Sequence, residues 1–450
     1  MKVHPIEYRY GTPEMKKIWS EESKIKKMIK VEIALLKALA DEGFLPKDKV
    51  KKFEEKILSN IDINKIKQIE DEIKHDVMAL VRYLSENAEK DVARWIHFGA
   101  TSNDITDSAT ALQLKESIEI LEDKLKKLVI LLSERAENHK NLVCLGRTHG
   151  QAALPLTYGF RFALWASEIL RHLIRLREIK PRVCVGKMSG AVGTQAGFGK
   201  RGLIIERKVM EYLGLKPADI SNQVIPRDIY CEYLSFLANV ATSLEKIATT
   251  LRLLQRTEVG EVFEKFEEKQ VGSSTMPHKR NPITCEQICS LARVIRSFVT
   301  SQYECSILWE ERDLTNSAAE RIILSEATIL LDHILTKMID VIQNLKLNEY
   351  NIKRNLKAVG DLNLSEAVML ELTKRGIDRQ TAHEIVRRLA IKAIESNTSL
   401  YDQLIKNDVI MKYITADELK DILNPEKYLG TATERIEEII NKVKSYVETS

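Results

Sequence analysis

The sequence has little of what marks secreted, membrane-spanning or nucleic-acid-binding proteins. Its six cysteines are too few and too scattered over 450 residues for a disulfide framework, so we expect reduced thiols. No apolar run approaches the ~20 residues that a membrane helix needs, and the first ten residues do not resemble a signal peptide. The 69 Lys and Arg nearly balance the 65 Asp and Glu, which leaves no strong basic field for DNA or RNA. We therefore expect a cytoplasmic protein without a membrane or nucleic-acid partner.

Glycine and proline are also scarce over long stretches of the chain. Only 18 Gly and 10 Pro occur, and none of them falls within residues 105–145, 227–259 or 283–359. Because both residue types interrupt helices, such windows favour long helices. Apolar residues recur there at intervals of three and four, which places them on one helix face. The two clearest stripes are Ile118, Leu121, Leu125, Leu128 and Leu132, and Leu237, Val240, Leu244, Ile247, Leu251 and Leu254.

These patterns predict an all-α fold with three helical domains. We assign residues 1–104 to an N-terminal domain, 105–352 to a central bundle of very long helices, and 353–450 to a C-terminal domain. The third window is too long for one helix, and we expect a break at the polar cluster 310–316. A helix of about 33 residues spans roughly 50 Å, so its apolar stripe needs equally long neighbours or other subunits. We therefore expect oligomerisation to form a multi-helix core.

The segment 272–286, GSSTMPHKRNPITCE, carries the densest set of reactive groups. It lies between two helical windows, and its prolines bar a regular helix, so we expect a loop bounded by long helices. Hydroxyls, an imidazole, two cations and an amide occur together, a mixture suited to binding a carboxylated substrate. A plain connector would need only polarity and a turn. The residues concerned are Ser273, Ser274, His278, Lys279, Arg280 and Asn281.

Besides His278, three further histidines lie in similarly dense contexts, whereas His139, His172, His333 and His383 lie in ordinary helical stretches. His75 occurs in KHDV, His97 in HFGATSND and His149 in GRTHGQ. His149 stands between Gly146 and Gly150, and we expect it at the end of a long helix, where backbone donors and side chains converge. These three, together with His278, are the candidate acids, bases or ligands among the histidines.

Two other patterns are not interpreted as sites. Residues 197–202, GFGKRG, formally match G-x-G-x-x-G, but no buried strand precedes them, so we expect a loop or hairpin and no nucleotide cofactor. Cys285 and Cys289 lie four residues apart without further spaced ligands, so no zinc site is expected.

Together these segments resemble the fumarase/aspartase superfamily, all-helical lyases that release fumarate by β-elimination. The stretch GSSTMPHKRNP carries the superfamily signature GSSxMPxKxNP, and HFGATSND and GRTHGQ resemble its second and third segments. Within the superfamily, the resemblance is to the adenylosuccinate lyase family, and it extends over essentially the full chain. The features that carry it are MPHKRNP, Arg9 followed by Tyr10, KHDV, NQVIPRD, ERDLTNSAAER and PEKYLG.

This resemblance implies a carbon–nitrogen lyase of purine nucleotide biosynthesis. It implies cleavage of adenylosuccinate to AMP, and of the succinyl-carboxamide ribotide SAICAR to AICAR, with fumarate as the second product of both. It implies no metal and no organic cofactor, because the substrate's own carboxylate takes up the electrons. It also implies a homotetramer in which three subunits contribute to each active site.

The resemblance also implies roles for individual residues. Ser273 matches the general base and His149 the general acid, which Glu286 orients, while Lys279 and Asn281 match the residues that hold the succinyl carboxylates. His75 is the alternative acid. The other matched positions are implied to bind substrate: Arg9, Tyr10, Arg312, Ser317 and Arg321 at the phosphate and ribose, Gln223 near the reacting carbons, and Asp76, His97, Thr101, Ser102, Thr148 and Ser274.

Two alternative classes share parts of this pattern. Argininosuccinate lyases and carboxymuconate cycloisomerases have the general signature. We do not expect them to have the residues HKR within MPHKRNP or the early Arg-Tyr pair. A non-catalytic helical protein that has kept the lyase fold would be expected to lack Ser273, His149, Lys279 or Glu286, and all four are present.

Overall fold

The computed structural model of the chain describes residues 2–266, 275–276 and 278–448. These residues form twenty α-helices, three short 3-10 helices and six short strands, which confirms the predicted all-α class. None of the helices in this described part could span a membrane. The predicted division into three domains stays a prediction. By contacts the chain forms two compact units, unit 1 with residues 1–125, 172–245 and 288–337, and unit 2 with residues 126–171, 246–287 and 338–450.

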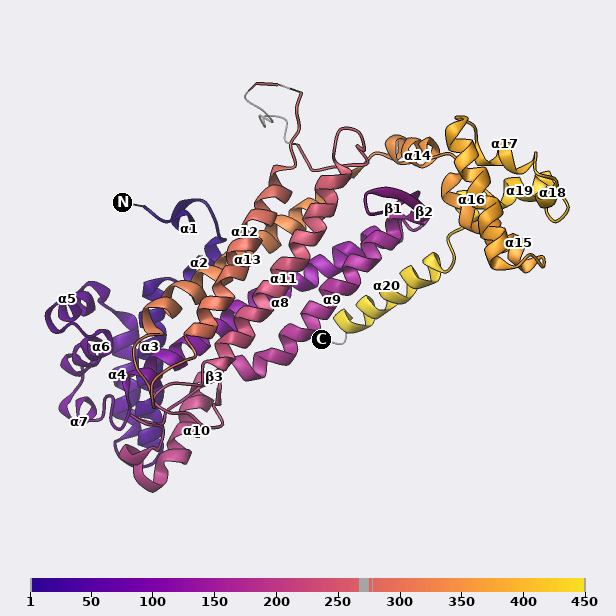
Figure 1. Ribbon diagram of the computed structural model, residues 1–450. Coiled ribbons are helices and arrows are strands. Elements are labelled where there is room, and N and C mark those ends of the chain that lie inside the picture. The colour runs from indigo at the N-terminus through magenta and orange to yellow at the C-terminus, as the bar shows by residue number, and fades with distance from the viewer. Residues whose placement is uncertain (1, 267–274, 277, 449–450) are drawn as a thin grey trace. The chain divides into compact units, whose positions relative to one another are not determined.

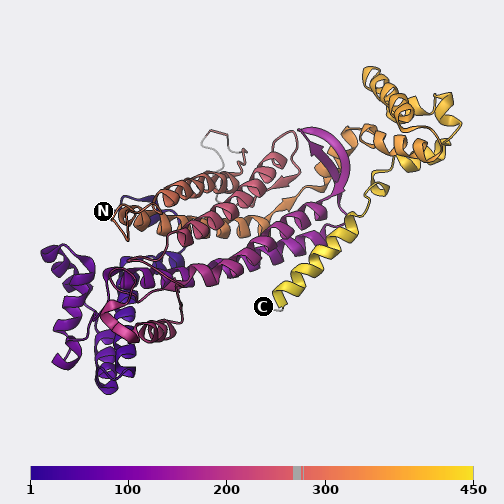
Figure 2. The ribbon, with the colours of Figure 1, turned by 60° about the horizontal axis from the view of Figure 1, so that its bottom comes forward.

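Unit 1 is built around the helix α3 (Glu21–Asp41). Ser20 caps its first turn, since the Ser20 hydroxyl accepts a hydrogen bond from the backbone N–H of Ser23 at 3.2 Å. Its buried face packs against α4 (Lys47–Ser59) and α10 (Gly202–Leu213), and both views of the ribbon show these helices together (Figures 1 and 2). The other elements that lie wholly in unit 1 are α1 (Pro5–Tyr8), α2 (Pro13–Ile18), α5 (Ile63–Ile73), α6 (Asp76–Glu86), α7 (Lys90–Ala93), the 3-10 helix η1 (Ala196–Arg201) and the parallel strand pair β3 (Val185–Gly186) and β4 (Lys216–Pro217).

The long helices predicted from the scarcity of glycine and proline are present. Every residue of both predicted apolar stripes is at most 6% exposed. The third window is broken as expected, because the cluster 310–316 lies between α12 and α13. The five longest helices are α8 (Ser102–Asn138), α9 (Tyr158–Val183), α11 (Asp228–Leu254), α12 (Ile283–Glu304) and α13 (Ser317–Asn344). Each of them contains a boundary between the two units.

The windows overestimate where these helices end. The first window reaches residue 145, but α8 ends at Asn138, and the chain then forms strand β1 (Val143–Thr148), which pairs antiparallel with β2 (Gln151–Thr157). The absence of glycine and proline permits a helix without requiring one, and the run Val143, Cys144, Leu145 packs well on a pleated surface. Similarly, α11 covers 27 residues and not the whole window 227–259. The segment 197–202 is also not the expected loop or hairpin, because η1 leads directly into α10.

Unit 2 contains the β1–β2 hairpin and a cluster of short C-terminal helices. Val143 pairs with Thr157 at the open end of the hairpin and Thr148 with Gln151 next to the turn. The short helices bury a separate apolar cluster that includes Leu372, Leu400 and Leu419. The other elements that lie wholly in unit 2 are the antiparallel pair β5 (Val262–Phe263) and β6 (Lys346–Leu347), α14 (Glu349–Ala358), η2 (Leu362–Leu364), α15 (Ser365–Lys374), α16 (Arg379–Glu395), α17 (Leu400–Leu404), α18 (Asp408–Met411), α19 (Ala416–Ile422), η3 (Pro425–Lys427) and α20 (Ala432–Glu448).

Candidate active site

The predicted site residues belong to two groups, one in each unit, and each group is described by itself. Ser273 and Ser274 lie outside the described residues. Unit 2 contains Thr148, His149, Lys279, Asn281 and Glu286. Unit 1 contains Arg9, Tyr10, His75, Asp76, His97, Thr101, Ser102, Gln223, Arg312, Ser317 and Arg321.

In unit 2, His149 lies in the turn of the β1–β2 hairpin. This corrects the expectation that it ends a long helix. His149 and Gly150 have φ of 54° and 75°, and together they form the two-residue turn between Thr148 and Gln151. Two positive φ values in a two-residue hairpin loop are typical of a type I′ turn. The structure therefore presents an exposed imidazole at the tip of the hairpin.

A buried carboxylate anchors this hairpin two residues from the histidine. Glu261 is fully buried and accepts hydrogen bonds from Arg147 Nη2 at 2.7 Å, the Tyr158 hydroxyl at 2.6 Å and Asn355 Nδ2 at 2.9 Å. Burial raises the pKa of Glu261, but these three donors outweigh it, and the pKa lies below the ordinary value. The carboxylate is therefore ionised and fixes the strand that precedes Thr148. No sequence pattern indicated Glu261.

The C-terminal part of the signature segment 272–286 is held by two side chains that the sequence did not single out. The Glu264 carboxylate accepts hydrogen bonds from the backbone N–H groups of Cys285, at 2.7 Å, and Thr284, at 3.1 Å. It thus caps the N-terminus of α12, which otherwise has unpaired N–H groups. Gln255 donates to the Arg280 carbonyl at 3.2 Å and accepts from the Glu264 N–H at 3.1 Å.

The predicted carboxylate-holding and orienting residues lie next to these held residues in the sequence. Glu286 lies in the first turn of α12 and is exposed, and the cap of this helix is Glu264 rather than Glu286. Lys279 is exposed, and Asn281 is partly buried. An exposed cation, an amide and a carboxylate are therefore available within eight residues of one another along the chain.

In unit 1, His75 caps the N-terminus of α6. Its Nδ1 accepts a hydrogen bond from the backbone N–H of Met78 at 3.3 Å. The next residue, Asp76, accepts a hydrogen bond from Arg321 Nη2 at 3.2 Å, which brings two predicted site residues from distant parts of the sequence together. Asp76 also accepts from the Val77 N–H at 2.8 Å. The capping bond uses Nδ1, so the proton of a neutral His75 resides on Nε2.

The segment from His97 to Thr101 is held at both ends by buried carboxylates. At one end, Glu32 of α3 contacts His97 through two oxygens, Oε1 to Nδ1 at 2.6 Å and Oε2 to the backbone N–H at 3.1 Å. At the other end, Asp104 accepts a hydrogen bond from the Thr101 N–H at 2.8 Å. Both carboxylates are fully buried. Gly99 lies between these two held ends of the segment, with φ of 73°. A Cβ there would meet Phe198 at 2.6 Å, so only glycine fits at this position.

Asp104 is also the centre of a buried charge pair with Lys187. Neither residue is exposed to solvent, and Lys187 Nζ lies 2.5 Å from Asp104 Oδ1. The same Nζ donates to the backbone carbonyl of Gln223 at 3.0 Å. The Gln223 side chain accepts a hydrogen bond from Arg312 Nη1 at 3.0 Å. The pair therefore connects Thr101, next to Ser102 at the start of α8, with Gln223 and Arg312.

Of the residues predicted to bind phosphate and ribose, all in unit 1, Arg312 lies in the loop between α12 and α13, and the others lie at or near helix ends. Ser317 is the first residue of α13, and Arg321 follows one turn later on the same helix. Unpaired N–H groups and the helix dipole make such an N-terminus suitable for an anion. Arg9 is the C-cap of α1, its guanidinium lies 6.0 Å from the Tyr10 ring, and Tyr10 packs edge-on against His333.

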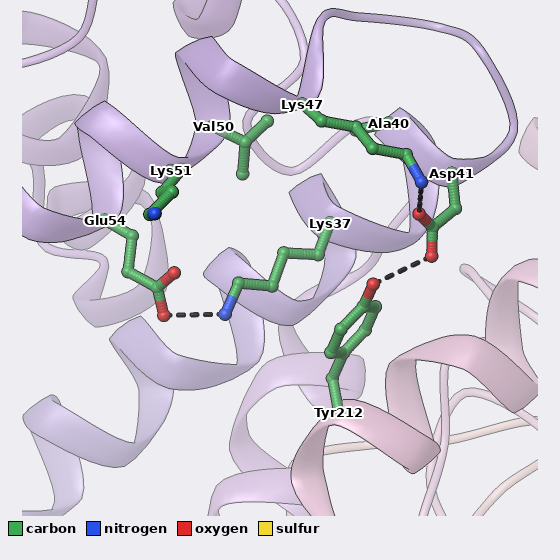
Figure 3. Close-up of a pocket in the computed structure, with 8 residues that line it drawn as sticks. All are labelled: Lys37, Ala40, Asp41, Lys47, Val50, Lys51, Glu54 and Tyr212. Atoms are coloured by element: carbon green, nitrogen blue, oxygen red, sulfur yellow. Dashed lines mark hydrogen bonds and ion pairs between the residues drawn. The ribbon is translucent and has the colours of Figure 1, made fainter.

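A hollow elsewhere in unit 1 is not part of this site. It has a volume of about 340 Å³ between α3, α4 and the Tyr212 ring of α10, and it contains no predicted site residue (Figure 3). Its polar groups largely satisfy one another. Lys37 pairs with Glu54 at 2.7 Å, and Asp41 binds both Lys47, at 2.6 Å, and the Tyr212 hydroxyl, at 2.8 Å.

The sequence matches two known protein families along its length. Residues 7–297 match a lyase family, and residues 361–439 match the family described as adenylosuccinate lyase C-terminus. The chain is 62% identical to an adenylosuccinate lyase of Archaeoglobus fulgidus, with 100% of both chains covered. It is 53% identical to an adenylosuccinate lyase of Methanocaldococcus jannaschii, covering 99% of this chain and 97% of the relative.

The fold is similar to solved structures of the superfamily. A fumarate lyase from Mesorhizobium sp. BNC1 superposes with a TM-score of 0.89 at 30% identity, with 98% of this chain and 100% of that chain covered. A 3-carboxy-cis,cis-muconate lactonizing enzyme from Pseudomonas putida gives 0.88 at 28% identity, with 98% and 99% covered. Because enzymes of different activity share this fold, the fold does not discriminate between the alternatives raised by the sequence. The sequence relatives do.

Proposed function

The chain belongs to the adenylosuccinate lyase family of the fumarase/aspartase superfamily and is a lyase, and from this premise we propose its substrates, residue roles and assembly. The substrates are adenylosuccinate, cleaved to AMP and fumarate, and SAICAR, cleaved to AICAR and fumarate. The observation that carries this proposal is the 62% identity to a curated adenylosuccinate lyase over the complete lengths of both chains.

The reaction is a β-elimination that breaks a carbon–nitrogen bond. A base removes a proton from the succinyl carbon next to a carboxylate, the electron pair forms the double bond of fumarate, and an acid protonates the departing nitrogen. In our proposal Ser273 is the base and His149 the acid, oriented by Glu286. Lys279 and Asn281 bind the succinyl carboxylates and stabilise the negative charge that develops on them.

The geometry at His75 supports His149 as the acid. An acid that releases its Nε2 proton from an imidazolium needs a second proton on Nδ1, but His75 Nδ1 accepts the Met78 N–H. His75 is therefore suited to donate a hydrogen bond to substrate from Nε2.

The phosphate and ribose contacts of the proposal fall on unit 1. The N-terminus of α13 supplies Ser317 and Arg321, and the Gln223 side chain holds Arg312 nearby in the same unit. Arg9 and Tyr10 complete this group. The helix N-terminus and the guanidinium groups match the charge and the hydrogen-bonding capacity of a phosphate.

We also propose a homotetramer whose active sites are shared between subunits. The loop that carries Arg312 exposes large apolar side chains, with Ile307 71%, Trp309 80% and Leu314 69% exposed. Exposed apolar clusters of this kind mark interaction surfaces. His149, also exposed, would gain the dry surroundings that acid catalysis favours if another subunit covered it. The six cysteines are free and buried, which fits the reducing cytoplasm that we propose as the location.

The choice between adenylosuccinate and argininosuccinate is tested by direct assay. We expect the purified protein to lower the absorbance of adenylosuccinate and of SAICAR solutions as fumarate is released, and to leave argininosuccinate unchanged. Turnover of argininosuccinate in place of the succinyl purines would contradict the proposal and favour that alternative. No turnover of any succinyl compound would favour the non-catalytic alternative.

Shared active sites are tested by mixing two inactive variants. Ser273→Ala and His149→Asn homotetramers should each be nearly inactive. If one site takes Ser273 and His149 from different subunits, dissociating and reassembling the mixture should restore part of the wild-type activity, because some sites receive both intact residues. Each variant treated alone in the same way is the control. Absence of any recovery in mixtures shown to contain hybrid tetramers would argue that both residues come from one subunit.

A further inference from the structure

The backbone of His97 adopts a conformation that is uncommon for residues other than glycine. Its φ of 61° lies in the left-handed region. A positive φ at a residue other than glycine costs free energy and persists where surrounding contacts hold the backbone in place. Such residues are found most often at functional sites. Here the support is Glu32, on a helix that is 65 residues away in sequence.

Glu32 uses its whole carboxylate on this one residue. One oxygen lies 2.6 Å from His97 Nδ1, and the other accepts the His97 backbone N–H at 3.1 Å. The Glu32 side chain is fully buried, whereas the His97 side chain is 14% exposed. Since one bond fixes the backbone and the other fixes the ring, the orientation of the imidazole is determined and Nε2 is the ring nitrogen left for a ligand.

The charges around His97 favour its protonated form. Burial lowers its pKa, but the hydrogen bond and the negative charge of Glu32 from α3, together with Asp104 from α8, outweigh burial and raise the pKa above the ordinary value of 6.5. With Nδ1–H donated to Glu32, a neutral ring would present a lone pair at Nε2 and repel an anion. A protonated ring presents an N–H there and attracts one.

A purely structural role does not account for a buried glutamate at this position. Burying a carboxylate costs several kcal/mol of desolvation free energy, and apolar side chains of similar volume often give equal or greater stability than a buried ion pair. Among the described residues, the hydrogen bonds and the ion pair of Glu32 lead only to His97. Its effect is therefore directed at one side chain.

We propose that Glu32 is a positioning residue for the lyase reaction, which through His97 presents a fixed, positively charged N–H to an anionic oxygen of the substrate. This inference rests on the proposed function, in which His97 contacts substrate. Glu32 itself touches no substrate. It acts through the orientation and the charge of the imidazole.

The first test follows the titration of His97 without any substrate. Exchange of the imidazole C2 hydrogen for deuterium, measured by mass spectrometry of the peptide that contains His97, gives the pH midpoint of that single ring. We expect a midpoint above 6.5 in the wild type and a lower one in Glu32→Gln. Glu206→Gln, which changes another buried carboxylate of unit 1 bonded to Met188 and Gln195, is the matched control and should leave the midpoint unchanged. Equal midpoints in the wild type and Glu32→Gln would overturn the proposal.

The second test separates binding from chemistry. In Glu32→Gln, KM for adenylosuccinate should rise about 10- to 100-fold near neutral pH, the factor that a lost charge-assisted hydrogen bond carries, while kcat changes less. The increase in KM should shrink as the pH falls, because acid restores the charge on His97. An increase in KM of equal size at every pH would indicate damage to the fold and would contradict the proposal.

A conservative variant keeps the inference testable if Glu32→Gln does not fold. Glu32→Asp retains the charge at a longer distance, so its His97 midpoint should stay above 6.5 while KM rises through poorer orientation. A midpoint at or below 6.5 in Glu32→Asp would then overturn the proposal. If the wild type turns over no succinyl nucleotide, the proposed function fails, but the exchange measurement still decides whether Glu32 controls His97.

Discussion

His149→Asn is expected to lower kcat by about 10²- to 10⁴-fold, the contribution of a positioned acid to proton transfer. Asparagine suits the structure at this position, because Asn followed by Gly is the preferred pair for the type I′ turn that His149 and Gly150 form. The hairpin should therefore keep its shape while the imidazole is lost. Steady-state kinetics with adenylosuccinate, together with an unchanged melting temperature, would establish the loss as chemical.

His75→Asn is the matched comparison for this measurement. Asparagine is also a good N-cap, so the Met78 N–H keeps an acceptor and α6 keeps its first turn. If His75 only donates a hydrogen bond to substrate, the variant should mainly raise KM. A collapse of kcat in His75→Asn with near-normal kcat in His149→Asn would reverse the two assignments and make His75 the acid.

Lys187→Met is expected to destabilise the protein by about 3–5 kcal/mol, the usual cost of leaving one member of a buried ion pair without its partner. Neither Lys187 nor Asp104 is exposed, and methionine fills the space of the lysine chain but not its charge. The remaining Asp104 would keep its backbone donors at Ser189 and Gly190 yet lose the only cation that contacts it among the described residues. Urea unfolding monitored by circular dichroism measures the change in the unfolding midpoint.

Lys47→Met is the control for this prediction. Lys47 also pairs with an aspartate, Asp41, at 2.6 Å, but its side chain is 73% exposed. Exposed ion pairs contribute at most about 1 kcal/mol, so the midpoint should hardly move. Similar decreases in unfolding free energy in Lys47→Met and Lys187→Met would show that burial does not make the Lys187 pair more important for stability.

The sequence predicted the helical class and the long helices because these depend on local properties. Freedom from glycine and proline and the spacing of Leu121, Leu125 and Leu128 are readable within one window, and the structure confirms the burial of those side chains. The β1–β2 hairpin was missed because the same window permits both helix and strand, and the strands are decided by pairing between Val143 and Thr157.

The partners of the site residues could not be predicted, because they come from remote parts of the chain. Glu32 lies 65 residues from His97, and Lys187 lies 83 residues from Asp104. A buried glutamate within a helix such as α3 carries no local mark that distinguishes it from a solvated one. The site histidines themselves were identified from their dense polar contexts and from the resemblance to a family, whereas their orientation needed the three-dimensional contacts.

The left-handed backbone at His97 and His149 restricts how these positions can drift during evolution. β-Branched and bulky side chains are penalised there, and glycine or asparagine is accommodated most easily. The replacements that the main chain tolerates best are thus ones that remove the imidazole. Adaptation to a new succinyl compound by single substitutions would therefore have to change residues other than these two. At positions 97 and 149 the histidine is either kept or replaced by a residue without an imidazole.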